Sequence, residues 1–145
     1  MIKINPYLIF NGKTEEAFNF YKSIFGGEFR PFQRFKDLPE KDREMANFDK
    51  KEAEKIVNIG LSVGDSGLMA NDTMESMPAK VGENIFLSLE VDGKEVAEKF
   101  FTRLSEGGKI HMALADTFWG AYCGMIKDKF GVGWVVSYAY PKHKS

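Results

Sequence analysis

The chain carries the same succession of segments twice, and this repeat constrains the fold more than any other feature of the sequence. Residues 2–10 are apolar and β-prone, and "NGKTEEAFNFYKSIFGG" (11–27) follows as a turn, an amphipathic helix and a Gly-Gly stop. Residues 84–91 and 92–108 repeat this order with "NIFLSLEV" and "DGKEVAEKFFTRLSEGG". The apolar stripes of the two helices correspond position by position: Ala17, Phe20, Tyr21 and Ile24 with Ala97, Phe100, Phe101 and Leu104.

Further strand candidates follow each helix in matching order. In the first half they are 28–36, 56–63 and 66–71, and in the second half 109–114, 118–126 and 132–140. The sequence therefore predicts an α+β fold made of two βαβββ modules, about 1–80 and about 81–145 of a single domain. Each module has a one-sided sheet, so we expect two modules to close a curved sheet around a cavity. Chance similarity is the alternative, because short strand–helix units obey the same capping and stop signals everywhere.

Two local features of the first half add detail to the predicted repeat. Thr14, followed by Glu15 and Glu16, predicts a capped, acidic first turn for the first helix. The charged segment 35–56 breaks the symmetry, and we interpret it as a solvated loop or short surface helix. The alternative is a mobile flap that carries Met45 and Phe48 over the mouth of the cavity.

Composition narrows the class of partner. The chain has 145 residues with 20 basic and 21 acidic side chains, a balance that argues against nucleic acid as a partner. Thirteen Phe, five Tyr and two Trp favour an aromatic-walled core or pocket. Cys123 is the single cysteine, which suits a reducing compartment, and we see neither a signal peptide nor an apolar run of membrane-spanning length. We expect a cytoplasmic protein with no membrane partner.

The last strand candidate contains no metal-binding side chain. In "DKFGVGWVVSYAY" (128–140), one face carries Val135, Ser137 and Ala139, and the other carries only Trp134, Val136, Tyr138 and Tyr140. No acidic residue or histidine is present after the turn, although a strand in this position often carries a functional group.

Three segments resemble a known superfamily: "PYLIFNGKTEEAFNFYKSIFGG" (6–27), "FLSLEVDG" (86–93) and "DTFWGAYCGMIKDKFGVGW" (116–134). Together with the order of elements, they are similar to the vicinal oxygen chelate superfamily, the glyoxalase/bleomycin-resistance/dioxygenase fold. Within it the chain resembles the PhnB-like branch, whose members are sometimes labelled "3-demethylubiquinone-9 3-methyltransferase" domains. The resemblance implies eight strands curled around a pocket in a mixed sheet.

The resemblance also implies where a metal would be held. Metal-dependent members place His, Gln or Glu on the first and last strand of each module, and these positions fall here on Pro6, Phe86, Val135 and either Met69 or Asn71. Catalytic divalent metals need imidazole or carboxylate donors, usually three or more. We therefore predict no metal and no cofactor. The two histidines, at 111 and 143, lie elsewhere.

A second departure concerns the rim of the implied cavity. The PhnB-like pattern commonly has charged residues after the Trp-Gly pair, whereas this chain has Ala121 and Tyr122. This difference weakens any inference about the substrate from relatives.

The expected ligand pocket is lined by side chains from both modules. Its predicted members are Leu8, Met69, Asn71, Phe86, Ser88, Trp119 and Val135. Trp119 is an aromatic wall or a core residue, the two being about equally favoured, whereas core packing is favoured for Trp134. The polar group Asn71, Asp72 and Thr73 lies at a strand end, where an ordinary Asx turn is the simpler interpretation.

Glu90 and Asp72 are weak candidates for catalysis. Glu90 becomes a general base if its strand face points into the cavity and burial raises its pKa; otherwise it lies at a strand end beside solvent, which we favour. His111 has no partner at metal or triad spacing, and Cys123 is best read as a small buried hydrophobe. The chain has no Gly-rich phosphate loop, CxxC, HExxH or GxSxG motif, and nothing resembles an S-adenosylmethionine site.

The leading hypothesis is a metal-free binding, sequestration or resistance-type protein for a small apolar or aromatic organic molecule, forming a homodimer with a shared or exchanged sheet. The alternative is a lyase or isomerase that uses Glu90, Asp72 or a metal held by non-standard ligands. A DNA-associated role gains no support from the charge balance.

Overall fold

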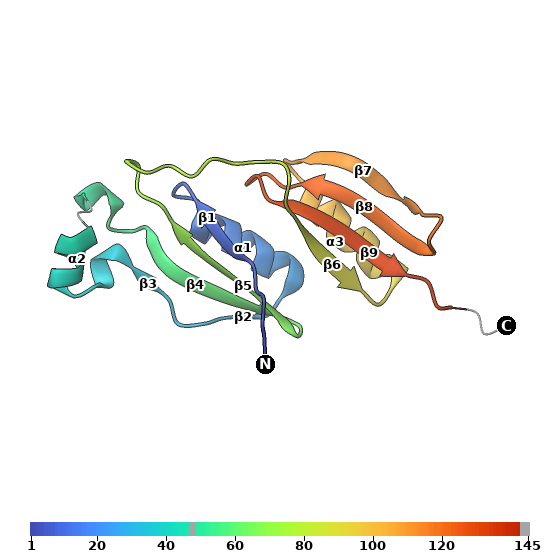
Figure 1. Ribbon diagram of the computed structural model, residues 1–145, viewed down its shortest axis with the longest axis horizontal. Helices are drawn as coiled ribbons and strands as arrows, with labels where there is room; N and C mark the ends of the chain where they lie inside the picture. Colours follow the sequence, from blue (N-terminus) through green and yellow to red (C-terminus); the bar gives the residue numbers. More distant parts are fainter. Residues whose placement is uncertain (47–48, 143–145) are drawn as a thin grey trace. The chain divides into compact units, whose positions relative to one another are not determined.

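The computed structural model describes residues 1–46 and 49–142 (Figure 1). The chain divides into two compact units, Met1–Lys80 and Val81–Ser145. Each unit is a mixed sheet with one principal helix, and we describe each by itself. That the two units form a single domain stays a prediction.

Unit 1 contains sheet 1, whose strand order is β1-β5-β4-β2, with β3 also paired to β4. β1 pairs with β5 in parallel, and the other pairs are antiparallel. The elements in chain order are β1 (Tyr7–Phe10), α1 (Thr14–Phe25), β2 (Glu28–Phe29), β3 (Gln33–Arg34), η1 (Phe35–Asp37), α2 (Glu40–Ala46), η2 (Lys50–Glu52), β4 (Ile56–Val63) and β5 (Ser66–Asp72).

Unit 2 contains sheet 2, with strand order β6-β9-β8-β7 and a parallel β6–β9 pair. Its elements are β6 (Phe86–Val91), α3 (Lys94–Ser105), β7 (Lys109–Asp116), β8 (Ala121–Lys127) and β9 (Gly133–Ala139). In both units the first strand lies parallel to the last, and the helix follows the first strand. The α+β class and the repeated order of elements predicted from the sequence are therefore confirmed. In unit 1 the predicted strand 28–36 is divided into the short strands β2 and β3, so sheet 1 has five strands and sheet 2 has four.

Each helix covers one face of its own sheet. The α1 side chains of Ala17, Phe18 and Tyr21 are fully buried, as are Leu61 on β4 and Ala70 on β5. In unit 2 the buried side chains of α3 are Ala97, Phe101 and Leu104. The spacing of these apolar positions explains why both segments are helices that pack on a sheet. We call the sheet face opposite each helix the open face of that sheet.

The first turn of α1 is capped from a distance. Its acidic residues Glu15 and Glu16 lie where the sequence predicts, but the N-cap position, Lys13, makes no side-chain cap bond. The backbone N–H of Thr14 instead donates to Asp72 Oδ1 on β5 at 3.0 Å, so Asp72 and not Thr14 caps the helix.

The charged segment 35–56 contains the short helices η1, α2 and η2, which agrees with the prediction of short surface helices. Met45 is 82% exposed, whereas Phe48 lies outside the described residues. In the part of the chain that the structure describes, no helix combines the length and apolar character needed to span a bilayer.

Candidate functional site

The open face of sheet 2 is defined by the alternation of its strands. Leu89, Val136 and Gly124 form one row across β6, β9 and β8. This row faces α3, because a Cβ placed on Gly124 would lie 2.6 Å from the ring of Phe101. Because side chains alternate along a strand, every second row starting from the one next to Leu89 lies on the open face. The residues of these rows include Phe86, Ser88, Glu90, Val135, Ser137, Cys123 and Met125.

Phe86 covers one end of this open face. Its ring lies over Gly133, where an added Cβ would approach it to 2.7 Å. The ring also contacts the imidazole of His111 edge to face, with centroids 5.8 Å apart. The sequence gives no sign that Phe86 and His111 are neighbours, whereas the structure places their rings in contact.

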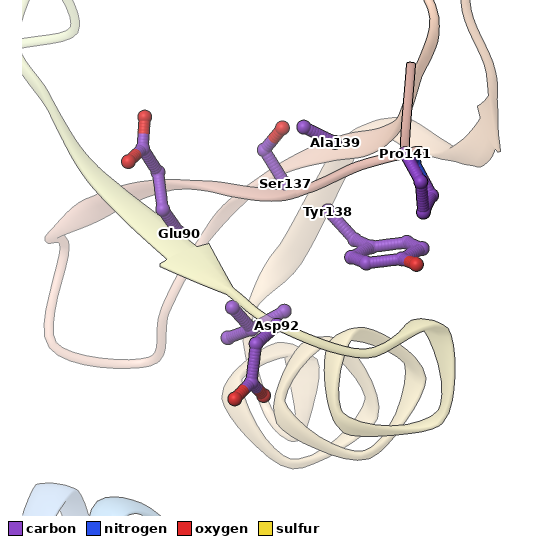
Figure 2. A pocket seen from close by; sticks show the side chains of 7 residues that line it. Glu90, Asp92, Ser137, Tyr138, Ala139 and Pro141 are labelled. Atoms are coloured by element: carbon purple, nitrogen blue, oxygen red, sulfur yellow. The ribbon is translucent and has the colours of Figure 1, made fainter. Parts of the chain in front are cut away.

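A hollow of about 390 Å³ lies at the carboxyl ends of β6 and β9 (Figure 2). It is lined by Glu90, Val91, Asp92, Ser137, Tyr138, Ala139 and Pro141. We call it the β6/β9 pocket. Figure 2 shows the carboxylates of Glu90 and Asp92 pointing to different sides of the strands, so they do not form a converging acidic pair. Of the seven lining residues, the sequence singles out only Glu90 as a site candidate.

Hydrogen-bonded tyrosines stiffen the wall beside this pocket. Tyr138 packs edge to face on Tyr140 at 5.3 Å, and the Tyr140 hydroxyl donates to Asp116 Oδ1 at 2.5 Å. This bond to a carboxylate raises the pKa of Tyr140 to about 12. Burial, followed by the bond from its hydroxyl to Glu98, raises the pKa of Tyr122. Both phenols therefore remain neutral hydrogen-bond donors at neutral pH.

In unit 1 the predicted pocket residues divide between the two faces of sheet 1. Met69 and Asn71 lie opposite Tyr7 and Ile9 on the open face, whereas Leu8 lies opposite the fully buried Ala70 on the α1 side. Leu8 therefore does not share the face of Met69 and Asn71. Tyr7 and Ile9, which are 48% and 53% exposed, lie on that face.

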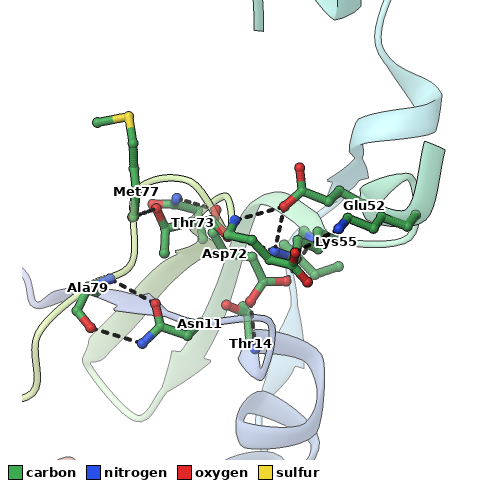
Figure 3. A network of polar contacts seen from close by, with 12 residues as sticks. Asn11, Thr14, Glu52, Lys55, Asp72, Thr73, Met77 and Ala79 are labelled. Atoms are coloured by element: carbon green, nitrogen blue, oxygen red, sulfur yellow. Dashed lines mark hydrogen bonds and ion pairs between the residues drawn. The ribbon is translucent and has the colours of Figure 1, made fainter. Parts of the chain in front are cut away.

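Asp72 belongs to a network of structural contacts (Figure 3). Its side chain is buried, and its two oxygens accept the backbone N–H groups of Thr14 at 3.0 Å and Ile56 at 2.9 Å. Close by, the Lys55 ammonium donates to Glu52 and to the Thr73 carbonyl, each at 3.0 Å. Because both Asp72 oxygens hold backbone, this arrangement favours a structural role over the catalytic one considered from the sequence.

The two tryptophans have different surroundings. Trp134 is buried and donates its indole N–H to Asp128 Oδ2 at 2.9 Å, so the core-packing interpretation is confirmed. Trp119 is 61% exposed in the β7–β8 turn, where it packs edge to face on the nearly fully exposed Phe118. Trp119 does not line the β6/β9 pocket.

The donor groups of the described residues do not fit a metal of the kind that the superfamily resemblance implies. Among residues 1–46 and 49–142, no three His, Cys, Asp or Glu side chains gather in a way that could hold an ion. Phe86 and Val135 share the open face of sheet 2 and offer no donor atom in their side chains. His143 lies outside the described residues.

Comparison with solved structures defines the class of fold. The chain is similar to a glyoxalase/bleomycin resistance protein/dioxygenase family enzyme from Burkholderia phytofirmans PsJN, with 15% identity, 92% and 95% of the two chains covered and a TM-score of 0.61. The fold is therefore that of the glyoxalases.

Two further structures and the family comparison are more specific. Protein PA1353 from Pseudomonas aeruginosa shares 39% identity, with 96% of this chain and 98% of that chain covered and a TM-score of 0.85. A putative 3-demethylubiquinone-9 3-methyltransferase, PhnB protein, from Bacillus cereus shares 24% identity over 95% and 100% of the chains, with a TM-score of 0.74. Residues 2–137 match the family described as 3-demethylubiquinone-9 3-methyltransferase, and the chain belongs to this family of PhnB-like domains.

Proposed function

We propose that this PhnB-like protein binds a small organic molecule in the β6/β9 pocket without the help of a metal. One observation carries the proposal: a pocket of about 390 Å³ lies beside the open face of sheet 2, on which Phe86 and Val135 stand where the superfamily resemblance implies metal ligands. This volume is in the range of small-molecule sites, which run from about 300 to 1,000 Å³.

The lining suggests the chemistry of the ligand. Val91, Ala139, Pro141 and the ring of Tyr138 supply apolar contact, while Glu90 and Asp92 offer carboxylate acceptors at opposite sides. A compact molecule with an apolar or aromatic body and an amine or hydroxyl donor matches this wall. Glu90 is exposed, so it serves as an acceptor for the ligand and not as a buried base.

We extend the proposal to a homodimer located in the cytoplasm, with no nucleic-acid partner. The eight-residue edge strand β7 supports the dimer, because it carries Ile110 at 51% and Met112 at 39% exposure. An exposed edge strand with apolar side chains is a ready surface for pairing with a second chain. The near-equal counts of acidic and basic residues support the absence of a polyanionic partner.

Native mass spectrometry of the purified protein, sprayed without chelator, tests the proposal directly. We expect a dimer mass without a metal adduct and with a co-purified or added organic ligand bound. Ser137→Leu should abolish ligand binding because the new side chain fills the pocket. Ser88→Leu is the matched control, since Ser88 lies on the same open face but does not line the pocket.

A stoichiometric divalent metal in the spectrum would overturn the metal-free proposal and favour the lyase or isomerase alternative. If Ser137→Leu and Ser88→Leu both lose the ligand equally, or if both keep it, the ligand does not bind in the β6/β9 pocket.

A further inference from the structure

The side chain of Arg30 lies across the open face of sheet 1. Arg30 directly follows the edge strand β2, and its backbone N–H donates to the Gly60 carbonyl at 2.9 Å. A Cβ placed on Gly60 would lie 3.0 Å from Arg30 Cδ, and one on Gly67 would lie 3.5 Å from its Nη2. The arginine therefore crosses β4 and brings its guanidinium over β5.

The two glycines make room for this side chain. Neither Gly60 nor Gly67 has a positive φ, so the backbone does not require glycine at these positions. The absence of a side chain at Gly60 lets the aliphatic part of Arg30 lie flat on β4.

The Arg30 guanidinium has no partner in the described part of the chain. Among the residues that the structure describes, neither a hydrogen bond nor an ion pair engages the Arg30 side chain, whereas Arg34 nearby bonds Glu15 and the carbonyl of Glu54. Glu28, on β2, lies two residues before Arg30 and is exposed, but no ion pair joins these two side chains. Arg30 is exposed, and it thus presents several N–H donors over β4 and β5 that no described residue uses.

Apolar groups lie beside this cation on the same face. Met69 follows Gly67 by two residues on β5, a separation of about 7 Å along a strand. Tyr7 pairs with Met69, and Ile9 pairs with Asn71 on the same parallel ladder. Tyr7 and Ile9 are each about half exposed. An unused guanidinium next to exposed apolar side chains is suited to a molecule with one anionic group and an apolar body.

We propose that the open face of sheet 1 binds the carboxylate or phosphate group of a small organic acid, with Arg30 gripping the anion and Tyr7 and Met69 contacting the apolar body. This site lies within unit 1, so it does not rest on the β6/β9 pocket of unit 2.

Amide NMR titration of the full chain tests the proposal with three probes: benzoate, phenyl phosphate and the uncharged benzyl alcohol. We expect benzoate or phenyl phosphate to shift the amide signals of Gly60, Gly67 and Met69, and benzyl alcohol to bind at least about tenfold more weakly. A response to benzoate alone identifies a carboxylate ligand, and a response to phenyl phosphate alone identifies a phosphate ligand.

Three variants separate the effect of the Arg30 guanidinium, at its position over β4 and β5, from the effect of net charge. Arg30→Gln should weaken binding of the responding probe at least about tenfold. Lys99→Gln, which removes an exposed charge on α3, should leave it unchanged. Gly60→Ala keeps the charge but displaces the arginine, and should also weaken binding. The proposal is overturned if neither anion shifts these signals, or if Arg30→Gln and Lys99→Gln have equal effects. The S137L experiment on the β6/β9 pocket has its own readout and is unaffected by either result.

Discussion

The ring of Phe86 meets the imidazole of His111 edge to face at 5.8 Å, although β6 and β7 are the two edge strands of sheet 2. Strands lie about 4.8 Å apart, so these two side chains span the width of three strand spacings. Phe86 does so by lying over Gly133, which lacks the side chain that would lift the ring. Phe86, the residue on which the superfamily resemblance places a metal ligand, is thus engaged in an aromatic contact.

This packing predicts strong coupling between residues 86 and 133. Gly133→Ala should lower the free energy of unfolding by about 1–3 kcal/mol, because the new methyl group collides with the Phe86 ring. In a Phe86→Ala background the same change should cost less, with a coupling of at least about 0.5 kcal/mol. Urea unfolding of the two single variants and the double variant gives this number. Additive effects would show that the Ile85 carbonyl, 3.0 Å from the added Cβ, causes the loss instead.

Asp72 should prove structural when it is replaced. Asp72→Ala leaves the buried N–H groups of Thr14 and Ile56 without their acceptor, so we expect a loss of about 2–4 kcal/mol in the free energy of unfolding. Asp65→Ala, in the exposed β4–β5 turn, should change stability by no more than about 0.5 kcal/mol. The folded fraction of Asp72→Ala should still bind the ligand. If Asp72→Ala stays as stable as wild type but no longer binds the ligand, Asp72 is again a candidate for catalysis.

The repeated topology could be predicted from the sequence because its signals are local. Each helix shows its apolar stripe and its Gly-Gly stop within one segment, and β4 lies at the predicted residues 56–63. The segment 2–10 shows the limit of such signals. Lys3 and Asn5 alternate with Ile2 and Ile4, but residues 6–10 are apolar throughout, so β1 itself does not show which of its side chains face α1. The sequence prediction puts Leu8 in one pocket with Met69, whereas the structure puts Leu8 on the α1 side of sheet 1.

The β6/β9 pocket and the position of Arg30 depend on contacts between distant segments, which local sequence patterns do not contain. Asp92 and Pro141 line the β6/β9 pocket only because β6 and β9 are parallel neighbours that end side by side. Arg30 is one charged residue among many in the sequence, and its position becomes visible only through Gly60 and Gly67, which lie on two other strands. A glycine inside a strand was the available signal, since it marks a close approach by another group.

Glu52 should make stability depend on pH in the acidic range. The N–H of Glu75 donates to its carboxylate at 2.8 Å and the Lys55 ammonium at 3.0 Å, and these bonds hold the pKa of Glu52 below its ordinary value of 4.5. A lowered folded-state pKa gives stability that is present above the unfolded-state value and is lost as the pH falls through the folded-state value.

Urea unfolding between about pH 6 and pH 3 measures this dependence. Wild type should exceed Glu52→Gln in stability at the upper end, and the difference should shrink steadily toward the lower end. Glu83→Gln, at an exposed position, is the control and should track wild type throughout. A difference between wild type and Glu52→Gln that stays constant with pH would contradict the assignment.

Tyr140 should make stability depend on pH at the alkaline end, through the bond to Asp116 that raises its pKa to about 12. Between the ordinary value of 10.0 and this raised value, the folded chain keeps the phenolic proton while the unfolded chain releases it. The unfolded state is therefore favoured progressively as the pH rises through this window.

Asp116→Ala should lower the pKa of Tyr140 toward 10.0 and weaken this alkaline loss. Ultraviolet titration of phenolate absorbance measures the pKa of Tyr140 in wild type and in Asp116→Ala, and Tyr140→Phe identifies the signal that belongs to Tyr140. An unchanged titration in Asp116→Ala would show that burial, and not the carboxylate, holds the proton on Tyr140.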